Sequence, residues 1–265
     1  MKGMDIAERI LLLLSRAPGS GDYFSSSTLQ RRSVETALTT LEREFPRLDE
    51  LVTGRRIVDF GCGYGYQCLA LATQYDATVV GIDVNPLGTE RGVAMAKDMK
   101  IPESKLSFVD RATAAMKGTF DVAISHNSFE HFQDPQAVLE EMKSLITDSG
   151  RILITFSPPW LSPYGSHMHF FTRVPWVNVL FPERAVMAVR SRFRDDGARK
   201  YEEVESGLNK MTLGRFERIA ASCGLEIAYK RYRCVKGLDL LGKVPLVREY
   251  FVNSVSAILV KRPPR

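Results

Sequence analysis

The sequence predicts an α/β protein built on an open, mostly parallel sheet of seven strands. From residue 56 onward, short apolar runs rich in β-branched residues alternate with helical segments, which is the pattern of βαβ units. A glycine-rich turn follows the first run, and a helix with two further strand-like runs follows a later irregular segment. With 265 residues, of which 45% are hydrophobic and 25% charged, the chain can bury a sizeable core.

Residues 1–52 are expected to form a helical N-terminal extension or cap. The apolar run 10–14 is too short for a signal-peptide core and follows charged residues, so it predicts the apolar stripe of a helix. A Gly/Ser-rich break is expected at 19–21 and a second helix over 33–45. No stretch of about 18 apolar residues occurs, so no membrane-spanning helix is expected.

Five strands separated by helices are expected between residues 57 and 155. Asn85-Pro86 and Asp134-Pro135 mark two helix starts, because Asn and Asp cap helices and Pro suits the first helical position. The second of these helices is expected to stop at Ser149-Gly150. The strands are expected at residues 57–60, 77–82, 106–109, 120–124 and 150–155.

The regular alternation breaks after the fifth strand. Residues 157–206 are rich in Pro, aromatics and Arg, and they predict an insertion or lid that faces the substrate. A helix over 212–223, closed by Gly224, and strands at 227–234 and 252–260 should complete the sheet. Residues 53–265 are therefore expected to form one Rossmann-like domain, with the insertion after its fifth strand.

A glycine-rich turn, Gly61-Cys62-Gly63-Tyr64-Gly65, lies where the first strand gives way to a helix. Glycines suit such a turn because the backbone must approach a ligand closely, which a Cβ would block. Asp59 precedes the glycines, where its charge could meet an ammonium group. Asp83 ends the second strand, where a carboxylate can accept hydrogen bonds from both ribose hydroxyls, and Asp110 ends the third, placed to accept from an adenine amino group. The alternative is that these residues only form turns.

The pattern hydrophobic-Asp-x-Gly-x-Gly-x-Gly resembles the class I S-adenosylmethionine-dependent methyltransferases, in particular their small-molecule, type 11-like group. The segment 120–127, followed by Phe129-Glu130-His131 and Asp134-Pro135, resembles the family's fourth-strand motif and the Glu-His pair that follows it. The resemblance runs over about residues 55–157, and the last helix and strand pair fit it too.

The resemblance implies S-adenosyl-L-methionine as the cofactor. Gly61, Gly63 and Gly65 would shape the pocket for its methionine moiety, Asp83 would bind ribose and Asp110 would bind adenine. The expected cofactor site also includes Asp59 and His126. It is completed by the two residues that directly follow the strand-end carboxylates, Val84 and Arg111.

Methyl transfer requires an aligned nucleophile and often a base that removes its proton. All 4 histidines of the chain lie after the fourth strand or in the insertion. We expect His167 and His169 on the acceptor side, with His131 as a further catalytic candidate. His131 could instead hold its loop by bonding the backbone, and the other two could be ordinary polar groups of a lid. A metal site at His167 and His169 would lack an accepted ligand spacing, and no metal is expected.

Two groups of insertion residues bear on the acceptor. The aromatic residues predict either an apolar lid or a small core of the insertion itself. The basic run indicates either a solvated helix face or contact with an anionic acceptor. The aromatic group is Trp160, Tyr164, Phe170, Phe171, Trp176 and Phe181, and the basic run is Arg184, Arg190, Arg192, Arg194, Arg199 and Lys200.

The sequence predicts methyl transfer to a small-molecule acceptor of aromatic or anionic character. Oxygen is the favoured atom for methylation, and a glycan, lipid or natural-product intermediate is the candidate acceptor. The alternatives are a tRNA or rRNA methyltransferase, for which the pI near 9.0 argues, and a catalytically silent cofactor-binding scaffold. Nucleic acid is the less favoured partner because no amino-methylation motif follows the fourth strand. A nicotinamide-dependent enzyme would need G-x-G-x-x-G spacing, whereas in this turn the third glycine follows the second by only two residues. The 4 cysteines predict reduced thiols and a cytoplasmic protein, and the oligomeric state stays open.

Overall fold

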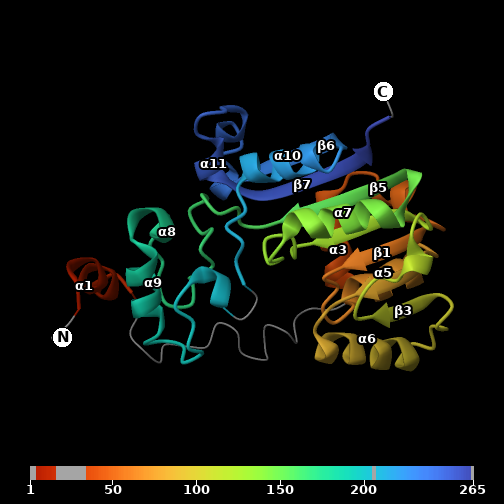
Figure 1. Cartoon of the computed structure of the whole chain (residues 1–265), viewed down its shortest axis with the longest axis horizontal. Coiled ribbons are helices and arrows are strands. Elements are labelled where there is room, and N and C mark those ends of the chain that lie inside the picture. Colours follow the sequence, from red (N-terminus) through yellow and green to blue (C-terminus); the bar gives the residue numbers. More distant parts are fainter. Residues whose placement is uncertain (1–3, 16–33, 205–206, 264–265) are drawn as a thin grey trace.

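The structure, a computed structural model, describes residues 4–15, 34–204 and 207–263. Within these residues seven strands form one sheet in the order β3-β2-β1-β4-β5-β7-β6 (Figure 1). Neighbours from β3 to β5 run parallel, and β7 pairs antiparallel with both β5 and β6. The predicted sheet is confirmed. Its strands are β1 (Arg56–Phe60), β2 (Thr78–Ile82), β3 (Leu106–Val109), β4 (Phe120–His126), β5 (Ile146–Phe156), β6 (Leu225–Cys234) and β7 (Val252–Lys261).

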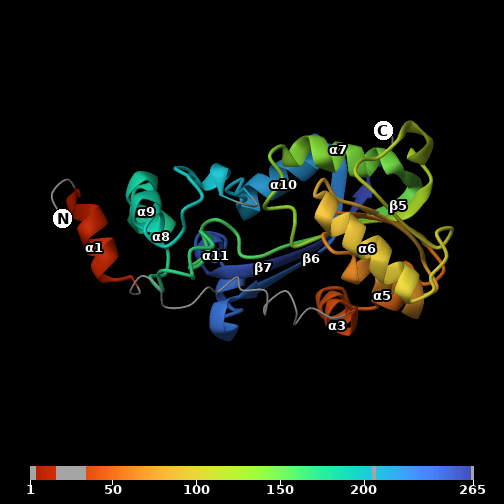
Figure 2. The ribbon, with the colours of Figure 1, turned by 90° about the horizontal axis from the view of Figure 1, so that it is seen from below.

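Helices cover both faces of the sheet, with α7 and α10 on one side and α3 and α5 on the other (Figure 2). The caps expected from the sequence are formed. Asn85 accepts from the Leu87 amide at 3.1 Å and Asp134 from the Ala137 amide at 3.0 Å. The helices of the described residues are α1 (Ile6–Leu13), α3 (Val34–Glu44), α4 (Leu48–Val52), α5 (Tyr66–Gln74), α6 (Pro86–Asp98), α7 (Pro135–Leu145), α8 (Val177–Leu180), α9 (Glu183–Arg190), α10 (Leu213–Ser222) and α11 (Arg248–Phe251).

The helix that begins at Pro135 ends earlier than the sequence predicts. It stops at Leu145 rather than at Ser149-Gly150, because Ile146 is already extended and pairs with Phe120 of β4. A Cβ on Gly150 would lie 2.7 Å from the Ile146 Cβ, so this glycine permits a tight fold-back within β5. Gly150 therefore belongs to an irregular strand start rather than to a helix end.

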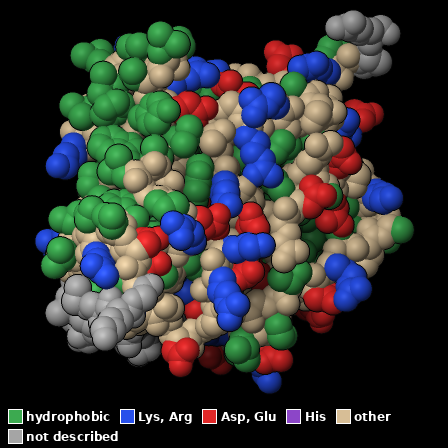
Figure 3. Space-filling view, turned by 60° about the vertical axis from the view of Figure 1, so that its left-hand side comes forward, with side chains coloured by type: hydrophobic (Ala, Val, Ile, Leu, Met, Phe, Trp, Pro, Cys, Tyr) green, Lys and Arg blue, Asp and Glu red, His purple; other side chains and the backbone are tan. Residues whose placement is uncertain are grey.

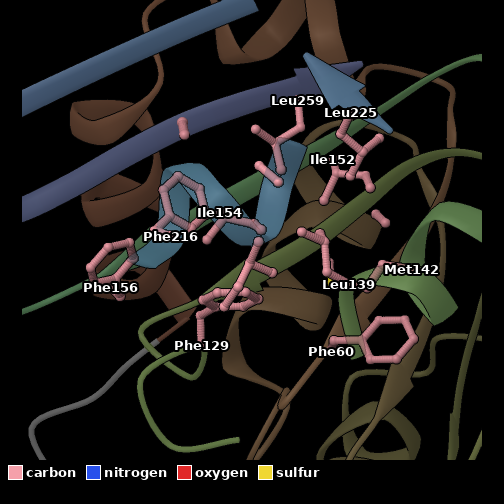
Figure 4. Packing of buried hydrophobic residues seen from close by; sticks show 14 of the residues in the cluster. Phe60, Phe129, Leu139, Met142, Ile152, Ile154, Phe156, Phe216, Leu225 and Leu259 are labelled. Atoms are coloured by element: carbon pink, nitrogen blue, oxygen red, sulfur yellow. The ribbon is translucent and has the colours of Figure 1, made fainter. Parts of the chain in front are cut away.

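An aromatic cluster joins the segment after β4 to α10 (Figure 4). The rings of Phe129 and Phe216 are 5.7 Å apart and edge-to-face, and those of Phe156 and Phe216 are 5.3 Å apart. Burial of each ring stabilises the fold by about 1.5–3 kcal/mol, and edge-to-face contacts add about 0.5–1.5 kcal/mol. The cluster thereby fixes the loop that carries residues 126–131.

A buried ion pair ties the N-terminal part of the chain to the far strands of the sheet. Glu44 of α3 is 3% exposed, pairs with Arg233 of β6 and accepts a hydrogen bond from the Ser256 hydroxyl of β7 at 2.7 Å. The second predicted N-terminal helix is thus confirmed and anchored. The expected break at 19–21 lies outside the described residues.

The insertion after β5 has its own core, which α1 completes. Leu11 of α1 is fully buried against Phe171, Val186 and other insertion residues, although the rest of the run 10–14 is largely exposed. Asp5 pairs with Arg184 of α9 at 2.9 Å. Four of the six insertion aromatics belong to this small core, namely Trp160, Phe170, Phe171 and Phe181, whereas Trp176 packs on Phe251. The alternative, an apolar lid over the acceptor, stays a prediction. In the described part of the chain, no helix has the length and apolar character needed to cross a membrane.

Candidate active site

A pocket of about 290 Å³ lies at the carboxyl ends of β1 and β4, the edge at which ligands bind in open α/β sheets. One helix, α3, closes a side of it with Thr36, Ala37 and Thr40. The other walls come from the glycine turn, the start of α5 and the end of β4, and they contribute Asp59, Gly61, Cys62, Gly63, Tyr64, Tyr66, Gln67, His126, Asn127 and Ser128.

The three glycines of the turn all have positive φ, at 70°, 54° and 75°, but they serve different purposes. A Cβ on Gly61 would lie 2.6 Å from the Ser128 Cβ, and one on Gly65 would lie 2.5 Å from the Phe108 ring. A Cβ on Gly63 would meet no protein atom within 4 Å. Two glycines are thus required by the packing of the protein itself, whereas Gly63 leaves open space along the pocket wall.

The Asp83 carboxylate anchors the turn. Its Oδ2 accepts from the Gly63 amide at 2.7 Å, and its Oδ1 accepts from the Asn85 amide at 2.8 Å. Each oxygen keeps a lone pair that could accept a further donor such as a ribose hydroxyl. Val84, the next residue, is 87% exposed.

Asp59 is a buried carboxylate at the pocket, only 2% exposed. Its Oδ2 accepts from Gln67 Nε2 at 3.1 Å and from the Cys68 thiol at 3.2 Å. Burial raises the pKa of Asp59 to about 7, a shift that the Cys68 hydrogen bond opposes and the Asp83 charge supports. The neighbouring Gln67 Oε1 is buried without a hydrogen-bond partner. A buried carboxylate and an unsatisfied amide oxygen together favour a ligand that brings positively charged N–H donors.

Asp110 and Arg111 follow β3 and lie outside the pocket lining. Both are exposed and pair with each other at 2.8 Å, and the Arg111 guanidinium lowers the pKa of Asp110. The structure places Asp110 at a strand end, as the sequence predicts, but its role toward adenine stays a prediction.

His126 ends β4 and lines the pocket. Its Nδ1 lies 2.8 Å from the Thr155 hydroxyl, which also accepts from the Asn127 amide at 3.0 Å. Neighbouring strands β4 and β5 therefore fix the orientation of this ring. Sequence reasoning missed Thr155, because only the register of the two strands brings it to His126.

The other three histidines lie beyond the described lining of this pocket. His131 Nδ1 lies 2.8 Å from the Gly207 carbonyl oxygen. This ring therefore bonds the backbone, which is the second of the two roles that the sequence allowed for His131. Its ring centroid is 5.5 Å from that of His167, and the His169 ring lies 4.6 Å from Tyr164. Burial lowers the pKa of His167 to about 4, and its Nε2 is buried without a partner. His167 is therefore neutral at pH 7.

Glu130 is a buried acid in the loop after β4. The sequence motif gave this residue no role of its own. It is 3% exposed, its Oε1 accepts from the Ser157 amide at 3.0 Å, and burial raises its pKa. The bond joins the loop after β4 to the start of the insertion. Glu130 thus holds together the two segments that carry His131 and His167.

The basic run of the insertion is partly structural. Arg190 is 1% exposed and binds Asp196 through two hydrogen bonds of 2.6 and 2.5 Å. The Arg190 hydrogen bond is the main reason why the pKa of Asp196 falls to about 2. Arg190 is therefore neither on a solvated face nor available to an anionic acceptor. Among the described residues, no three His, Cys, Asp or Glu side chains converge closely enough for a metal ion.

Comparison with known proteins places this chain in a family. The sequence model of a family described as a methyltransferase domain matches residues 29–227. Ajmaline N-methyltransferase from Rauvolfia serpentina is 34% identical over 116 residues, which cover 42% of this chain and 38% of that protein. A ubiquinone biosynthesis O-methyltransferase from Nitrosococcus oceani is 30% identical over 120 residues, covering 44% of this chain and 50% of that protein.

Solved structures show the same fold. Magnesium protoporphyrin IX methyltransferase from Synechocystis PCC 6803, solved with bound SAH, aligns with a TM-score of 0.53 at 18% identity over 86% of this chain and 83% of that one. The alignments with the first curated relatives span half of those proteins or less. Because the family match covers most of the chain, the protein belongs to the class I S-adenosylmethionine-dependent methyltransferase family.

Proposed function

We propose that this protein transfers a methyl group from S-adenosylmethionine to a small-molecule acceptor, with oxygen as the favoured atom. The observation that carries the proposal is the buried Asp59 carboxylate beside the unsatisfied Gln67 Oε1. An ammonium group on the methionine moiety of the cofactor would supply both with donors and would neutralise the carboxylate. The family match supports this assignment, and the open space at Gly63 leaves room for the ligand.

Other residues would hold the remaining parts of the cofactor. Asp83, oriented by two backbone amides, would accept the ribose hydroxyls, and Asp110 would accept the adenine amino group. His126 would contact the cofactor from the end of β4. The cofactor, when bound, supplies an activated methyl group on a sulfonium, so the protein mainly has to align the acceptor and exclude water.

The acceptor side is proposed to lie at the insertion. His167 and His169 belong to the segment after β5, and His131 reaches the same place from the loop after β4. An imidazole nitrogen there could take up the proton of an acceptor hydroxyl. Aromatic or anionic character of the acceptor remains part of the proposal. The free thiols of the described residues accord with a reducing compartment, and we propose the cytoplasm.

Calorimetry and thermal melts test the cofactor assignment on the full chain. S-adenosylhomocysteine should bind and raise Tm, whereas NAD should not. Absence of binding to both S-adenosylmethionine and S-adenosylhomocysteine would overturn the proposal. A panel of phenols, alcohols, amines and tRNA, assayed with a labelled methyl donor, then identifies the acceptor. Label transfer to tRNA alone would replace the small-molecule assignment with the nucleic-acid one.

A further inference from the structure

The connection between β6 and β7 displays large aliphatic side chains to solvent. Two antiparallel strands need only a short turn, but here residues 235–251 intervene, and long connections of this kind often carry function. Leu240 is 76% exposed, Leu246 is 89% exposed and Val244 is 44% exposed. Nothing in the fold requires such residues to face solvent.

The connection carries more exposed basic than acidic side chains. Asp239 is exposed, and its Oδ1 accepts from the Cys234 amide at 2.8 Å. Glu249 is partly buried and accepts from the Gly214 amide at 2.7 Å at the start of α10. Lys236 and Lys243 are exposed and pair with no described acid. The exposed surface of the connection is therefore apolar, with more positive than negative charge.

Two neighbouring elements extend this surface. Trp176, which precedes α8, donates from Nε1 to the Tyr250 carbonyl at 3.1 Å and so joins α8 to the connection. On α8, Val179 and Leu180 are 47% and 63% exposed. Figure 3 shows hydrophobic side chains gathered along this side of the molecule, with Lys and Arg and also some Asp and Glu side chains along their border.

The helix α1, at the same end of the molecule, adds an outward apolar stripe (Figure 1). Ile6, Ile10 and Leu13 are 76%, 46% and 83% exposed, and their spacing puts them on one helix face. The opposite face buries Leu11 in the insertion core. A surface helix normally turns its apolar stripe inward, so α1 is oriented as though its outer face had a partner.

We propose that this surface, formed by α1, α8 and the β6–β7 connection, docks on an anionic phospholipid bilayer. The aliphatic side chains would enter the boundary between headgroups and acyl chains, and Lys236 and Lys243 would contact lipid phosphates. The charges favour a membrane over a second copy of this chain. A self-complementary interface would bring Lys236 and Lys243 of one copy against those of the other, with Asp239 as the one fully exposed acid of the connection to meet them. The docking does not depend on methyl transfer.

Flotation with phospholipid vesicles tests the proposal on the full chain without cofactor. The protein should float with vesicles of phosphatidylcholine mixed with phosphatidylglycerol, and binding to pure phosphatidylcholine should be much weaker. Leu240→Ser with Leu246→Ser should reduce binding about tenfold or more, because buried methylene groups provide the affinity. Lys236→Glu with Lys243→Glu should remove the dependence on phosphatidylglycerol.

Control variants carry changes of the same kind at the far end of the molecule. Val93→Ser on α6 and Lys100→Glu just after that helix alter an exposed aliphatic residue and an exposed lysine, and they should bind vesicles like the unaltered protein. Thermal melts confirm that every variant is folded. Equal flotation of the leucine variant, or no flotation with anionic vesicles, would overturn the proposal. A concentration-dependent dimer that the leucine variant abolishes would instead assign the surface to self-association.

Discussion

The Cys68 thiol donates a hydrogen bond to the Asp59 carboxylate across 3.2 Å, inside a site from which solvent is almost absent. A thiol is a weak donor and only partly replaces the water that a carboxylate loses on burial. The charged form of this buried acid is therefore poorly stabilised, and burial raises the pKa of Asp59 to about 7 in the free protein. This arrangement costs folding stability, and in the proposed function it prepares the site for the ammonium group of the cofactor.

Replacing Asp59 should weaken cofactor binding without lowering the stability of the fold. Asp59→Asn removes the charge while keeping the shape, so S-adenosylhomocysteine affinity should fall about 10- to 100-fold, as expected for a lost charged hydrogen bond. Tm above pH 7 should rise, because the buried charge is gone. Calorimetry and thermal melts measure the two effects. Asp98→Asn, on exposed α6, should change neither; a stability loss in Asp59→Asn would contradict the account.

Cofactor affinity should depend on pH through the same residue. The pKa of Asp59 is about 7 in the free protein, so S-adenosylhomocysteine should bind more tightly as pH rises toward 7 and then level off. Stability should show the opposite trend. Because the folded pKa lies above its unfolded value of 3.8, Asp59 ionises first in the unfolded chain, and the free energy of unfolding falls as pH rises between those two values. Both slopes should disappear in Asp59→Asn.

Alanine substitutions should distinguish the glycines of the turn. Gly61→Ala would push a Cβ into Ser128 and should destabilise the fold by about 2–4 kcal/mol, from strain and overpacking together. Gly63→Ala should cost only about 1 kcal/mol of backbone strain but should weaken S-adenosylhomocysteine binding, since its Cβ enters open space. Adding Ser128→Gly should recover part of the loss in Gly61→Ala. Chemical denaturation and calorimetry measure these effects.

The buried pair of Glu44 and Arg233 should be important for stability. Arg233→Met leaves the buried Glu44 with only the mostly exposed Arg43, whose Nε lies 3.6 Å away. We expect a loss of about 2 kcal/mol, reduced from the fully buried case because Arg233 is 27% exposed and Arg43 remains. Arg231→Met, two residues away, removes an exposed hydrogen bond to the Arg43 carbonyl and should cost about 0.5 kcal/mol or less. Equal losses in urea denaturation would show that the ion pair has no special role.

Histidine variants should separate the acceptor side from the cofactor side. His169→Ala and His167→Asn should lower turnover, by about 100-fold or more if the ring is a general base, while S-adenosylhomocysteine affinity stays near normal. Asn suits position 167 because its φ is 58°. His126→Gln should weaken cofactor binding instead. A matching loss of affinity in His169→Ala would remove that residue from the acceptor side.

The parts that sequence predicted well depend on local patterns. Strand positions, two capped helix starts and the turn at Gly61–Gly65 follow from short motifs, and the seven-stranded, mostly parallel sheet follows from how strands and helices alternate. Features created by contacts between distant segments were not predictable in this way. Examples are Glu44 with Arg233, His126 with Thr155, and the early end of α7, which strand pairing of Ile146 decides.

The core of the insertion is completed by α1, a helix that lies far from the insertion in the sequence. Leu11 fills its centre, and Ser15 forms a bridge with Thr172. A chain shortened to begin at Val34 would retain every strand and the glycine turn, but it would leave that core open to water. Transplanting the insertion into a related enzyme would therefore require moving α1 with it. In the proposed function, where the insertion forms the acceptor side, changes in acceptor preference should arise from paired substitutions in both segments, while the pocket beside β1 and β4 remains unchanged.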